Sequence, residues 1–259
     1  MSANLDSDSD FQDAAPKPRP RRGLRIGDLL AIVAIVALLI ALLLPATRSS
    51  GYAARHAARR SQCVNNMKQI SLALWNYERE YKALPPAYTV DAHGRPLHSW
   101  RTLILPYLEQ ESLYKSIDLS KPWNDPVNAK ALKTPVPIFR CPESYGPENA
   151  TTYLAISSPD SCFMPGKPRR LDEITDDHGS TLMLIDAGEE NAVPWMAPMD
   201  ADEALVLRLG PKTRLHHEGG MNVGLVDGSV RFVKATTSAE VRCAIMSISG
   251  GEHVSNDEF

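Results

Sequence analysis

The stretch GLRIGDLLAIVAIVALLIALLLPA, residues 23–46, decides the architecture that we expect for this chain. It contains sixteen consecutive apolar residues, 29–44, which as a helix would span about 24 Å at 1.5 Å per residue. The flanking residues lengthen the segment enough to cross the roughly 30 Å hydrocarbon core of a bilayer. The sequence therefore predicts a transmembrane helix over 24–46, which would be a single membrane anchor.

The residues on either side of this segment leave its processing and its orientation open. Residues 1–23 form a leader without apolar periodicity, acidic in its first half and rich in proline and basic residues in its second. The sequence PATR at 45–48 is a poor signal-peptidase site, so an uncleaved anchor competes with a cleaved signal peptide. Basic residues are nearly balanced on the two sides, so the positive-inside rule does not orient the segment.

The composition of the whole chain, 259 residues of which 43% are hydrophobic and 23% charged, is that of a globular protein. Its length suits one large domain or two small ones. Disordered proteins have fewer apolar residues and a larger net charge. The formal charge of -3 gives no overall attraction to nucleic acid, which we therefore do not expect as a partner.

Residues 47–86 are predicted to continue the amino-terminal helix as an amphipathic segment, after a short break at 49–51. Within 52–81 one apolar stripe recurs at alternating spacings of four and three residues. The stripe consists of Cys63, Met67, Ile70, Leu74 and Tyr77. The basic stretch 55–60 lies on other faces, either as a solvated surface or as a patch for lipid headgroups. The prolines that follow Leu84 end the helix.

Residues 87–249 are predicted to form a globular domain, and 250–259 a polar tail. The first part of the domain is loop-rich, with a short helical pair over 100–114 that is broken by a proline. Short strands are expected at 151–156, 181–185, 221–226 and 229–233. The last two flank Asp227-Gly228, a dipeptide that favours a two-residue type I′ hairpin. A long helix followed by antiparallel strands is an α+β order, so the apolar stripe should pack on a sheet face.

No residue is nominated as catalytic, and neither a metal nor a cofactor is expected. His216, His217, Glu218 and Asp227 are adjacent enough to be read as metal ligands, since zinc and manganese accept imidazole and carboxylate. On a strand, however, the two histidines would point to opposite faces, and Asp227 is explained by its turn. We expect His217 to hydrogen-bond near the hairpin. The sequence has no Walker loop, HExxH motif or GxSxG elbow.

The four cysteines, Cys63, Cys141, Cys162 and Cys243, are the other candidates for chemistry. In an exported domain the oxidising surroundings would make disulfides available, and four cysteines allow three connectivities. Their spacing is far from that of a C-x-x-C zinc or redox site. Cys63 lies on the apolar stripe, where simple packing would also explain it.

Several stretches, in the same order along the chain, resemble one large bacterial family, the pseudopilin-like domain-of-unknown-function family 1559. They are the anchor ending in LLLPA, AARHAARRSQCVNNMKQISLALWNYE, SWRTLILPYLEQESLY, PWNDPVN, FRCPES, and LDEITDDHGSTLMLIDAGE followed by AVPWMAP. Near the carboxyl end, His217 lies nine residues before Asp227-Gly228 and SVRFV, which is similar to the family's prepilin processing-associated signature. At the amino end, Gly23 precedes an apolar helix with an acid, Asp28, at the fifth position after it, which resembles a type IV prepilin signal.

The resemblance implies a type IV pilin-like fold, in which a long helix packs on a mainly antiparallel sheet with loop-rich insertions. It also implies that a prepilin peptidase cuts after Gly23, so that Leu24 becomes the methylated amino terminus. The amino terminus would lie in the cytoplasm, the helix in the bacterial inner membrane, and the globular domain in the periplasm or at the cell surface. Asp28 stands where the family has Glu, and Arg25 is also unusual, so the pattern is matched with two departures.

The implied function is structural or interactive: a subunit linked to a type II secretion-like or type IV pilus-like system. Its implied partners are the membrane, the prepilin peptidase and other pseudopilin-like subunits. Two other functions stay open. One is a membrane-anchored periplasmic metal-dependent hydrolase that uses His217 and Asp227. The other is a glycan- or peptide-binding module, which would need an open apolar cleft.

Overall fold

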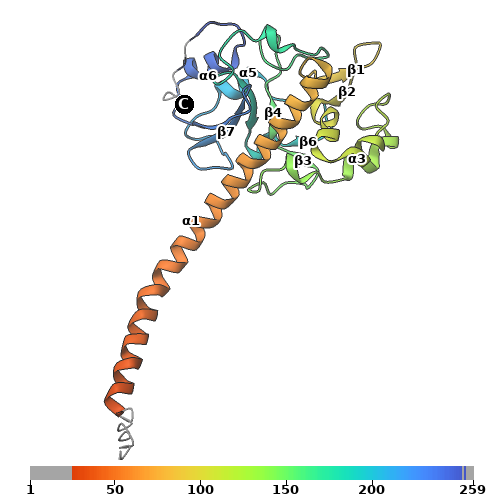
Figure 1. Ribbon diagram of the computed structural model, residues 1–259. Coiled ribbons are helices and arrows are strands. Elements are labelled where there is room, and N and C mark those ends of the chain that lie inside the picture. The colour runs from red at the N-terminus through yellow and green to blue at the C-terminus, as the bar shows by residue number, and fades with distance from the viewer. Residues whose placement is uncertain (1–24, 253, 255–259) are drawn as a thin grey trace, which may run out of the picture. The chain divides into compact units, whose positions relative to one another are not determined.

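The computed structural model describes residues 25–252 and 254, apart from the side chains of 42–50 and 52 (Figure 1). The predicted leader 1–23, the first residue of the predicted mature chain and the end of the predicted tail lie outside these residues. The chain divides into two units, Met1–Ala53 and Ala54–Phe259.

Helix α1, Ile26–Tyr81, is the longest element, and its backbone is continuous through both the predicted anchor and the predicted amphipathic segment. The break expected at 49–51 is wrong. Serine and glycine cost a helix only about 0.5 to 1 kcal/mol each relative to alanine, too little to interrupt a helix that is long on both sides. At the start of α1, the Asp28 carboxylate accepts a hydrogen bond from the Arg25 backbone N–H at 3.1 Å. An acid in this position satisfies a free N–H and suits the positive end of the helix dipole.

In the first unit, the described large apolar side chains of α1 are exposed on all sides of the helix. They are Ile26, Leu29, Leu30, Ile32, Val33, Ile35, Val36, Leu38, Leu39 and Ile40. Because successive residues are rotated by about 100°, such a run has no polar face. Across the described residues, no helix combines the length and the apolar character that crossing a membrane requires. The predicted transmembrane segment 24–46 lies partly outside those residues.

The centre of the second unit is a four-stranded antiparallel sheet with the strand order β4-β5-β7-β8. These strands are β4 (Tyr153–Ala155), β5 (Leu182–Asp186), β7 (Gly220–Leu225) and β8 (Val230–Lys234). The carboxyl-terminal part of α1 covers one face of the sheet (Figure 1). The other face packs on two short helices, α5 (Glu203–Leu207) and α6 (Ala239–Met246). The predicted α+β class with antiparallel strands is therefore confirmed.

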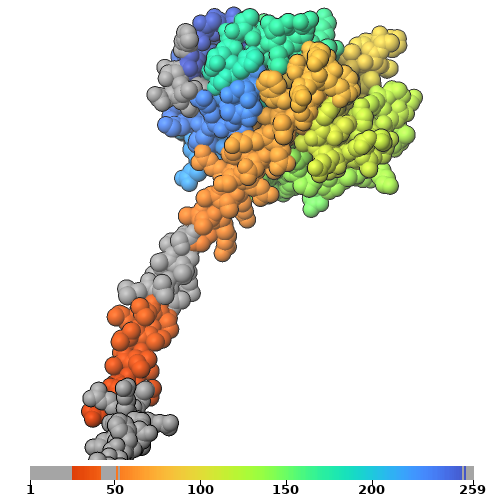
Figure 2. All heavy atoms as spheres, in the orientation of Figure 1, coloured from red at the N-terminus to blue at the C-terminus, as the bar shows by residue number. Residues whose placement is uncertain are grey.

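The rest of the second unit is built from short elements, as the loop-rich middle of the sequence predicts. Two further antiparallel pairs are β1 (Tyr88–Val90) with β2 (Pro96–Ser99), and β3 (Ala150–Thr151) with β6 (Val193–Pro194). The short α-helices here are α2 (Trp100–Leu103), α3 (Glu111–Lys115) and α4 (Ala129–Lys133). Pro106 opens a 3-10 turn between α2 and α3, which confirms the broken helical pair. In the space-filling view, the part of α1 in this unit lies between this middle region and the carboxyl-terminal strands (Figure 2).

The apolar stripe of α1 forms the centre of the core. Cys63, Met67, Ile70 and Leu74 are fully buried, and Tyr77 packs on the core from its edge. Full burial of such a side chain stabilises the fold by about 1.5–3 kcal/mol. The helix ends at Tyr81 because the next residue, Lys82, turns into the left-handed region at φ 61°.

The turn between β7 and β8 differs from the predicted type I′ hairpin. A type I′ turn needs positive φ at both central residues, whereas here Gly228 has φ +84° and Asp227 is not left-handed. The Gly228 N–H donates to the Leu225 carbonyl at 2.9 Å, and the Leu225 N–H donates to the Ser229 carbonyl at 2.9 Å. The connection is therefore a three-residue loop with the glycine in a bulge. The hairpin is confirmed, and its turn type is corrected.

Candidate functional site

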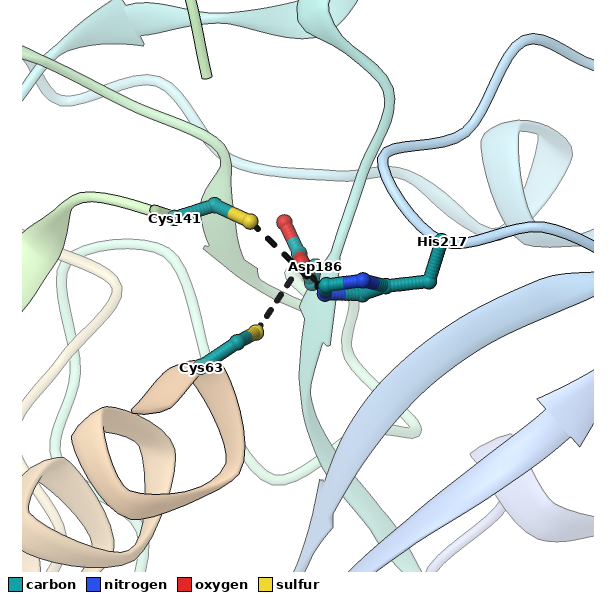
Figure 3. Close-up of side chains that lie close together, drawn as sticks. All are labelled: Cys63, Cys141, Asp186 and His217. Atoms are coloured by element: carbon teal, nitrogen blue, oxygen red, sulfur yellow. Dashed lines mark hydrogen bonds and ion pairs between the residues drawn. The ribbon is translucent and has the colours of Figure 1, made fainter. Parts of the chain in front are cut away.

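Four buried side chains from distant parts of the sequence meet where α1 covers the sheet (Figure 3). They are Cys63, Cys141, Asp186 and His217, and together we call them the thiol cluster. One ligand atom from each side chain lies within 4.8 Å of all the others. The two cysteines are fully buried, and the aspartate and histidine are 1% and 6% exposed. The four side chains are therefore shielded from bulk solvent.

Each member of the thiol cluster comes from a different element. Cys63 belongs to the buried stripe of α1, and Asp186 is the last residue of β5, every residue of which is buried. Cys141 lies two residues beyond a 3-10 turn, Pro137–Phe139. His217 lies in the loop before β7. Packing of α1 on the sheet is thus what brings these four residues together.

The Asp186 carboxylate lies at the centre of the contacts within the cluster. Its Oδ2 atom accepts a hydrogen bond from the Cys63 thiol at 3.1 Å and lies 3.4 Å from His217 Nε2. The same Nε2 atom lies 3.7 Å from Cys141 Sγ. Two sulfurs, one imidazole nitrogen and one carboxylate oxygen therefore converge on a common point.

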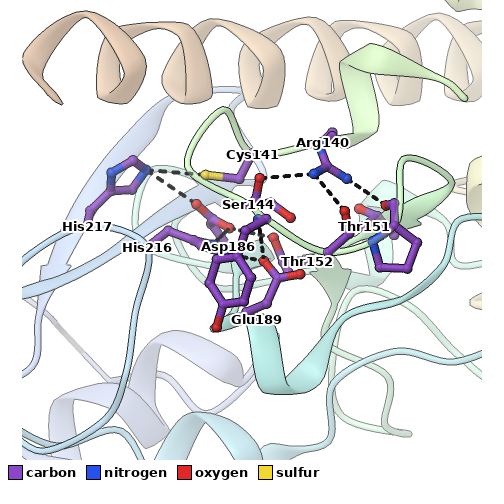
Figure 4. Close-up of polar contacts among 12 residues, drawn as sticks. Arg140, Cys141, Ser144, Thr151, Thr152, Asp186, Glu189, His216 and His217 are labelled. Carbon is purple, nitrogen blue, oxygen red and sulfur yellow. Dashed lines mark hydrogen bonds and ion pairs between the residues drawn. The ribbon is translucent and has the colours of Figure 1, made fainter. Parts of the chain in front are cut away.

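Outer contacts hold these groups in place (Figure 4). The other Asp186 oxygen, Oδ1, accepts a hydrogen bond from Thr152 Oγ1 at 2.8 Å and lies 3.1 Å from His216 Nδ1. The second ring nitrogen of His216 lies 3.0 Å from Glu189 Oε2. Asn222 Nδ2 donates to Cys63 Sγ at 3.2 Å. The carboxylate and one thiol are thus oriented from outside the cluster.

The ionisable groups of the cluster shift one another strongly. Burial alone would raise the pKa of Asp186, but hydrogen bonds from His216 and His217 outweigh it and hold that pKa well below its usual range. Burial alone would lower the pKa of His217. Hydrogen bonds, of which the one to Asp186 has the largest effect, instead raise that pKa to about 9. A hydrogen bond from Cys141 lowers the pKa of Cys63 to about 7, and the same contact together with burial raises the pKa of Cys141. The site therefore favours an ionised carboxylate and eases formation of a thiolate at Cys63.

Such an arrangement has three chemical uses. Two thiols, an imidazole and a carboxylate can together hold a transition-metal ion. Two neighbouring thiols can form a disulfide, although all four cysteines are free in this structure. A buried hydrogen-bonded network can simply fix the packing of the helix on the sheet.

The prediction that the two adjacent histidines point to opposite faces of a strand is wrong. Strand β7 begins at Gly220, so His216 and His217 lie in a loop, and the alternation of a strand does not apply to them. Both rings reach the same carboxylate, one at each oxygen of Asp186. The His217 backbone carbonyl accepts a hydrogen bond from the N–H of Gly220, the first residue of β7, at 3.4 Å, whereas its side chain contacts Asp186 and Cys141.

The remaining predicted residues lie elsewhere. Asp227 is in the turn, where its Oδ1 accepts the Ser229 N–H at 2.8 Å, and it is not a member of the cluster. Its neighbour Gly228 has the positive φ that the bulge requires. Glu218 is exposed. Of the processing residues, Asp28 is described above, and Gly23 and Leu24 lie outside the described residues.

The four cysteines divide into a pair and two single residues. Cys63 and Cys141 meet in the thiol cluster. Cys162 is buried elsewhere and donates to the Leu182 carbonyl at 3.3 Å. Cys243 is exposed on α6. Disulfides among them stay a prediction. Cys63 and Cys141 are the pair to examine first, because both lie in the thiol cluster.

Sequence reasoning missed Asp186, although one signal could have found it. It is the single charged residue in the buried strand LMLID, and a charge inside a buried strand needs a partner. The outer contacts made by Thr152, Glu189 and Asn222 left no comparable signal, because such residues are common in loops and strands.

Comparison with known protein families shows which family the chain belongs to. A family model with the description Protein of unknown function (DUF1559) matches residues 52–181, half of the chain. The matched region contains both cysteines of the thiol cluster and ends before Asp186. No match was found among curated proteins or among solved structures. The chain belongs to the family described as Protein of unknown function (DUF1559).

Proposed function

We propose that this chain is a pseudopilin-like structural or interaction subunit, not an enzyme. In this proposal residues 24–46 anchor it in the bacterial inner membrane, with the amino terminus in the cytoplasm and the second unit in the periplasm or at the cell surface. It works with other pseudopilin-like subunits in a type II secretion-like or type IV pilus-like system. Prepilin peptidase processes it after Gly23.

One observation carries the proposal: the two parts of α1 have different surfaces. The described part before residue 42 exposes large apolar side chains on every side, whereas the part within the second unit buries only one stripe. A helix that is apolar all round needs an apolar surrounding, which a bilayer or a bundle of like helices supplies. The sixteen-residue apolar run in the sequence supports the same assignment.

The geometry of the thiol cluster supports a role without catalysis. Its four members are buried, and a catalytic metal site keeps one position open to water or substrate. The alternative function as a metal-dependent hydrolase requires Asp227 beside His217. The Asp227 carboxylate instead accepts a hydrogen bond within the turn between β7 and β8. We therefore assign no catalytic residue.

The amino terminus of the mature chain tests this proposal. Intact-mass analysis of the full-length protein, recovered from membranes of the native bacterium, should give a chain that starts at a methylated Leu24. Replacing Gly23 by Leu should leave the leader attached. The matched control is Gly27→Ala, because the space around Gly27 is open, and it should be processed normally. A start at Met1 or Ser2, or one beyond Ala46, would contradict the proposal.

A second candidate function is a binding module, which one cavity favours. A cavity of about 490 Å³ lies beside β5, β7 and α5, a volume in the range of small-ligand sites. Its apolar wall includes Ile185, Val206, Leu209 and Met221, and its rim carries the exposed side chains of Arg208, Lys212 and Arg214. Glu190 also lies in the lining, but three basic side chains against one carboxylate leave the rim positive, which suits a short acidic peptide that carries an apolar side chain.

Fluorescence anisotropy with labelled peptides tests the second candidate. Acidic peptides with one leucine or phenylalanine should bind, and the double variant Lys212→Glu/Arg214→Glu should lose at least tenfold in affinity. The double variant Lys130→Glu/Lys133→Glu, on α4, is the control of equal charge change and should bind normally. Equal binding by both variants, or none by the native chain, would remove this candidate.

A further inference from the structure

We propose that the thiol cluster binds one zinc ion in a closed, structural site that fastens α1 to the sheet. This inference goes beyond the proposed function, because neither the pseudopilin-like role nor the binding-module alternative requires a metal. The ligands are Cys63 Sγ, Cys141 Sγ, Asp186 Oδ2 and His217 Nε2.

The distances between the ligand atoms match a tetrahedral zinc site. Bonds of about 2.3 Å to sulfur and about 2.0–2.2 Å to nitrogen and oxygen place neighbouring ligand atoms roughly 3.3–3.8 Å apart. The observed separations are 3.1 Å from sulfur to oxygen, 3.4 Å from nitrogen to oxygen and 3.7 Å from sulfur to nitrogen. Only small shifts of side chains would be needed for all four atoms to reach one ion.

The donor atoms select the metal. Magnesium and calcium prefer sites built entirely from oxygen, so two sulfurs argue against both. Zinc accepts thiolate, imidazole and carboxylate together and favours four ligands in a tetrahedron. Because the four residues are buried, no position is left for substrate, which is typical of a structural zinc site.

The outer contacts are those that orient metal ligands. Thr152 and His216 occupy Asp186 Oδ1, which leaves Oδ2 to bind the ion through one oxygen. The Asn222 amide donates to Cys63 Sγ, a contact that stabilises a thiolate. Such outer hydrogen bonds fix ligand orientation and tune affinity in metalloproteins. A cluster held together by packing alone would not need them at two of its ligands.

Charge balance also favours a cation. Binding of Zn²⁺ displaces to solvent the thiol protons of Cys63 and Cys141 and the Nε2 proton of His217, which then binds as a neutral imidazole. The three anionic ligands and the ion then carry a net charge of about -1. The hydrogen bonds donated by Asn222 and Thr152 stabilise this negative charge. No change in oxidation state is involved.

The site would join segments that are far apart in the sequence. Cys63 and Asp186 are separated by 123 positions, and Cys141 and His217 by 76. Because an unfolded chain does not preform such a site, the free energy of zinc binding adds to the stability of the folded second unit. The ion would hold α1 on the sheet at the level of Cys63.

Metal analysis of the full-length chain tests this proposal. Protein purified in mild detergent without chelators should contain close to one zinc per chain by inductively coupled plasma mass spectrometry. The variants Cys63→Ser and His217→Ala should lose at least nine-tenths of it. Cys162→Ser is the matched control, since that thiol is also buried but lies outside the cluster, and it should keep its zinc.

A second measurement covers variants that fail to fold. Replacing zinc by Co²⁺ in the native chain should give the visible absorption bands of tetrahedral cobalt and the near-ultraviolet band of cobalt–thiolate bonds. Absence of zinc together with absence of these bands would overturn the proposal. So would an intact mass two hydrogens lower than that of the reduced chain, with Cys63 and Cys141 linked in the peptide map, because the two thiols would then form a disulfide.

Discussion

Two buried polar sites in the second unit look alike in burial but differ in how their charges are satisfied. One is the ion pair of Arg101 with Asp200, whose side chains are 0% and 2% exposed. Arg101 also donates to the Tyr153 carbonyl and to Ser99 Oγ, and Asp200 also accepts hydrogen bonds from Trp100 and the Ala155 backbone. The chain itself therefore supplies both charges of this pair.

The thiol cluster is built from the opposite kind of group. Its sulfurs, carboxylate and imidazole are all potential ligands, and their donor atoms point at one another. The Asp186 carboxylate is also paired, with His216 and His217, but two thiols converge on it as well, and thiol, imidazole and carboxylate together form a zinc ligand set that the Arg101–Asp200 pair lacks. This difference is why we infer a metal at the thiol cluster and none at the Arg101–Asp200 pair.

Breaking the ion pair should have the largest effect. Arg101→Met leaves Asp200 buried without its counter-charge, which should lower the free energy of unfolding by about 3–5 kcal/mol. Because burial raises the pKa of Asp200, the loss should shrink as the pH falls and the carboxyl group becomes protonated. Denaturant unfolding of the purified chain measures both.

The double variant Arg101→Met/Asp200→Leu is the control for this experiment. It removes both charges and should recover most of the lost stability, with the zinc content unchanged in either variant. A single variant that costs under 1 kcal/mol would contradict our description of the pair.

Removal of the metal should have the next largest effect. In the native chain, free zinc at 100 times its Kd should stabilise the fold by about 2.7 kcal/mol, and chelation should remove that increment. Thermal unfolding with and without a chelator measures it. In His217→Ala the chelator should change nothing. A chelator effect of equal size in both proteins would place the metal elsewhere.

An outer contact should matter less than a ligand. Asn222→Ala removes the hydrogen bond to Cys63 Sγ and should weaken zinc binding by about 10- to 100-fold. Competition with a colorimetric chelator gives the affinity. Asn128→Ala is the control, because Asn128 is also buried but donates to the Asp118 and Pro122 carbonyls, away from the cluster. Equal affinities in the two variants would argue against an outer role for Asn222.

An ion pair near the surface should have the smallest effect. Arg59 Nη1 lies 3.0 Å from Glu143 Oε2, and the Arg59 side chain is 50% exposed. Because solvent screens such pairs, Arg59→Gln should lower the free energy of unfolding by less than about 1 kcal/mol. Its zinc content should equal that of the native chain. A loss of several kcal/mol would show that burial is the wrong basis for ranking the three sites.

Local patterns explain what could be predicted from the sequence. The stripe through Cys63 and Leu74 follows helical periodicity, so its burial was predictable, and the Asp227-Gly228 dipeptide indicated the hairpin. The turn type was not, because the same dipeptide fits a type I′ turn and a bulged three-residue loop. The strand argument that separated His216 from His217 failed because β7 begins three residues later.

The thiol cluster could not be predicted, for a physical reason. Zinc sites are found in sequences through paired ligands a few residues apart, and here each ligand stands alone on a different element. Only the packing of α1 on the sheet brings Cys63 to Asp186. The sequence showed each cysteine separately, and at Cys63 packing alone was a sufficient explanation.

X-ray absorption at the zinc edge of the full-length chain shows whether one zinc ion completes the thiol cluster. We expect a first shell of two sulfurs at about 2.3 Å and two nitrogen or oxygen atoms at about 2.0–2.2 Å. We also expect His217→Ala to remove this signal. A shell of nitrogen and oxygen alone, a shell of four sulfurs, or no zinc edge in the native chain would contradict the proposal.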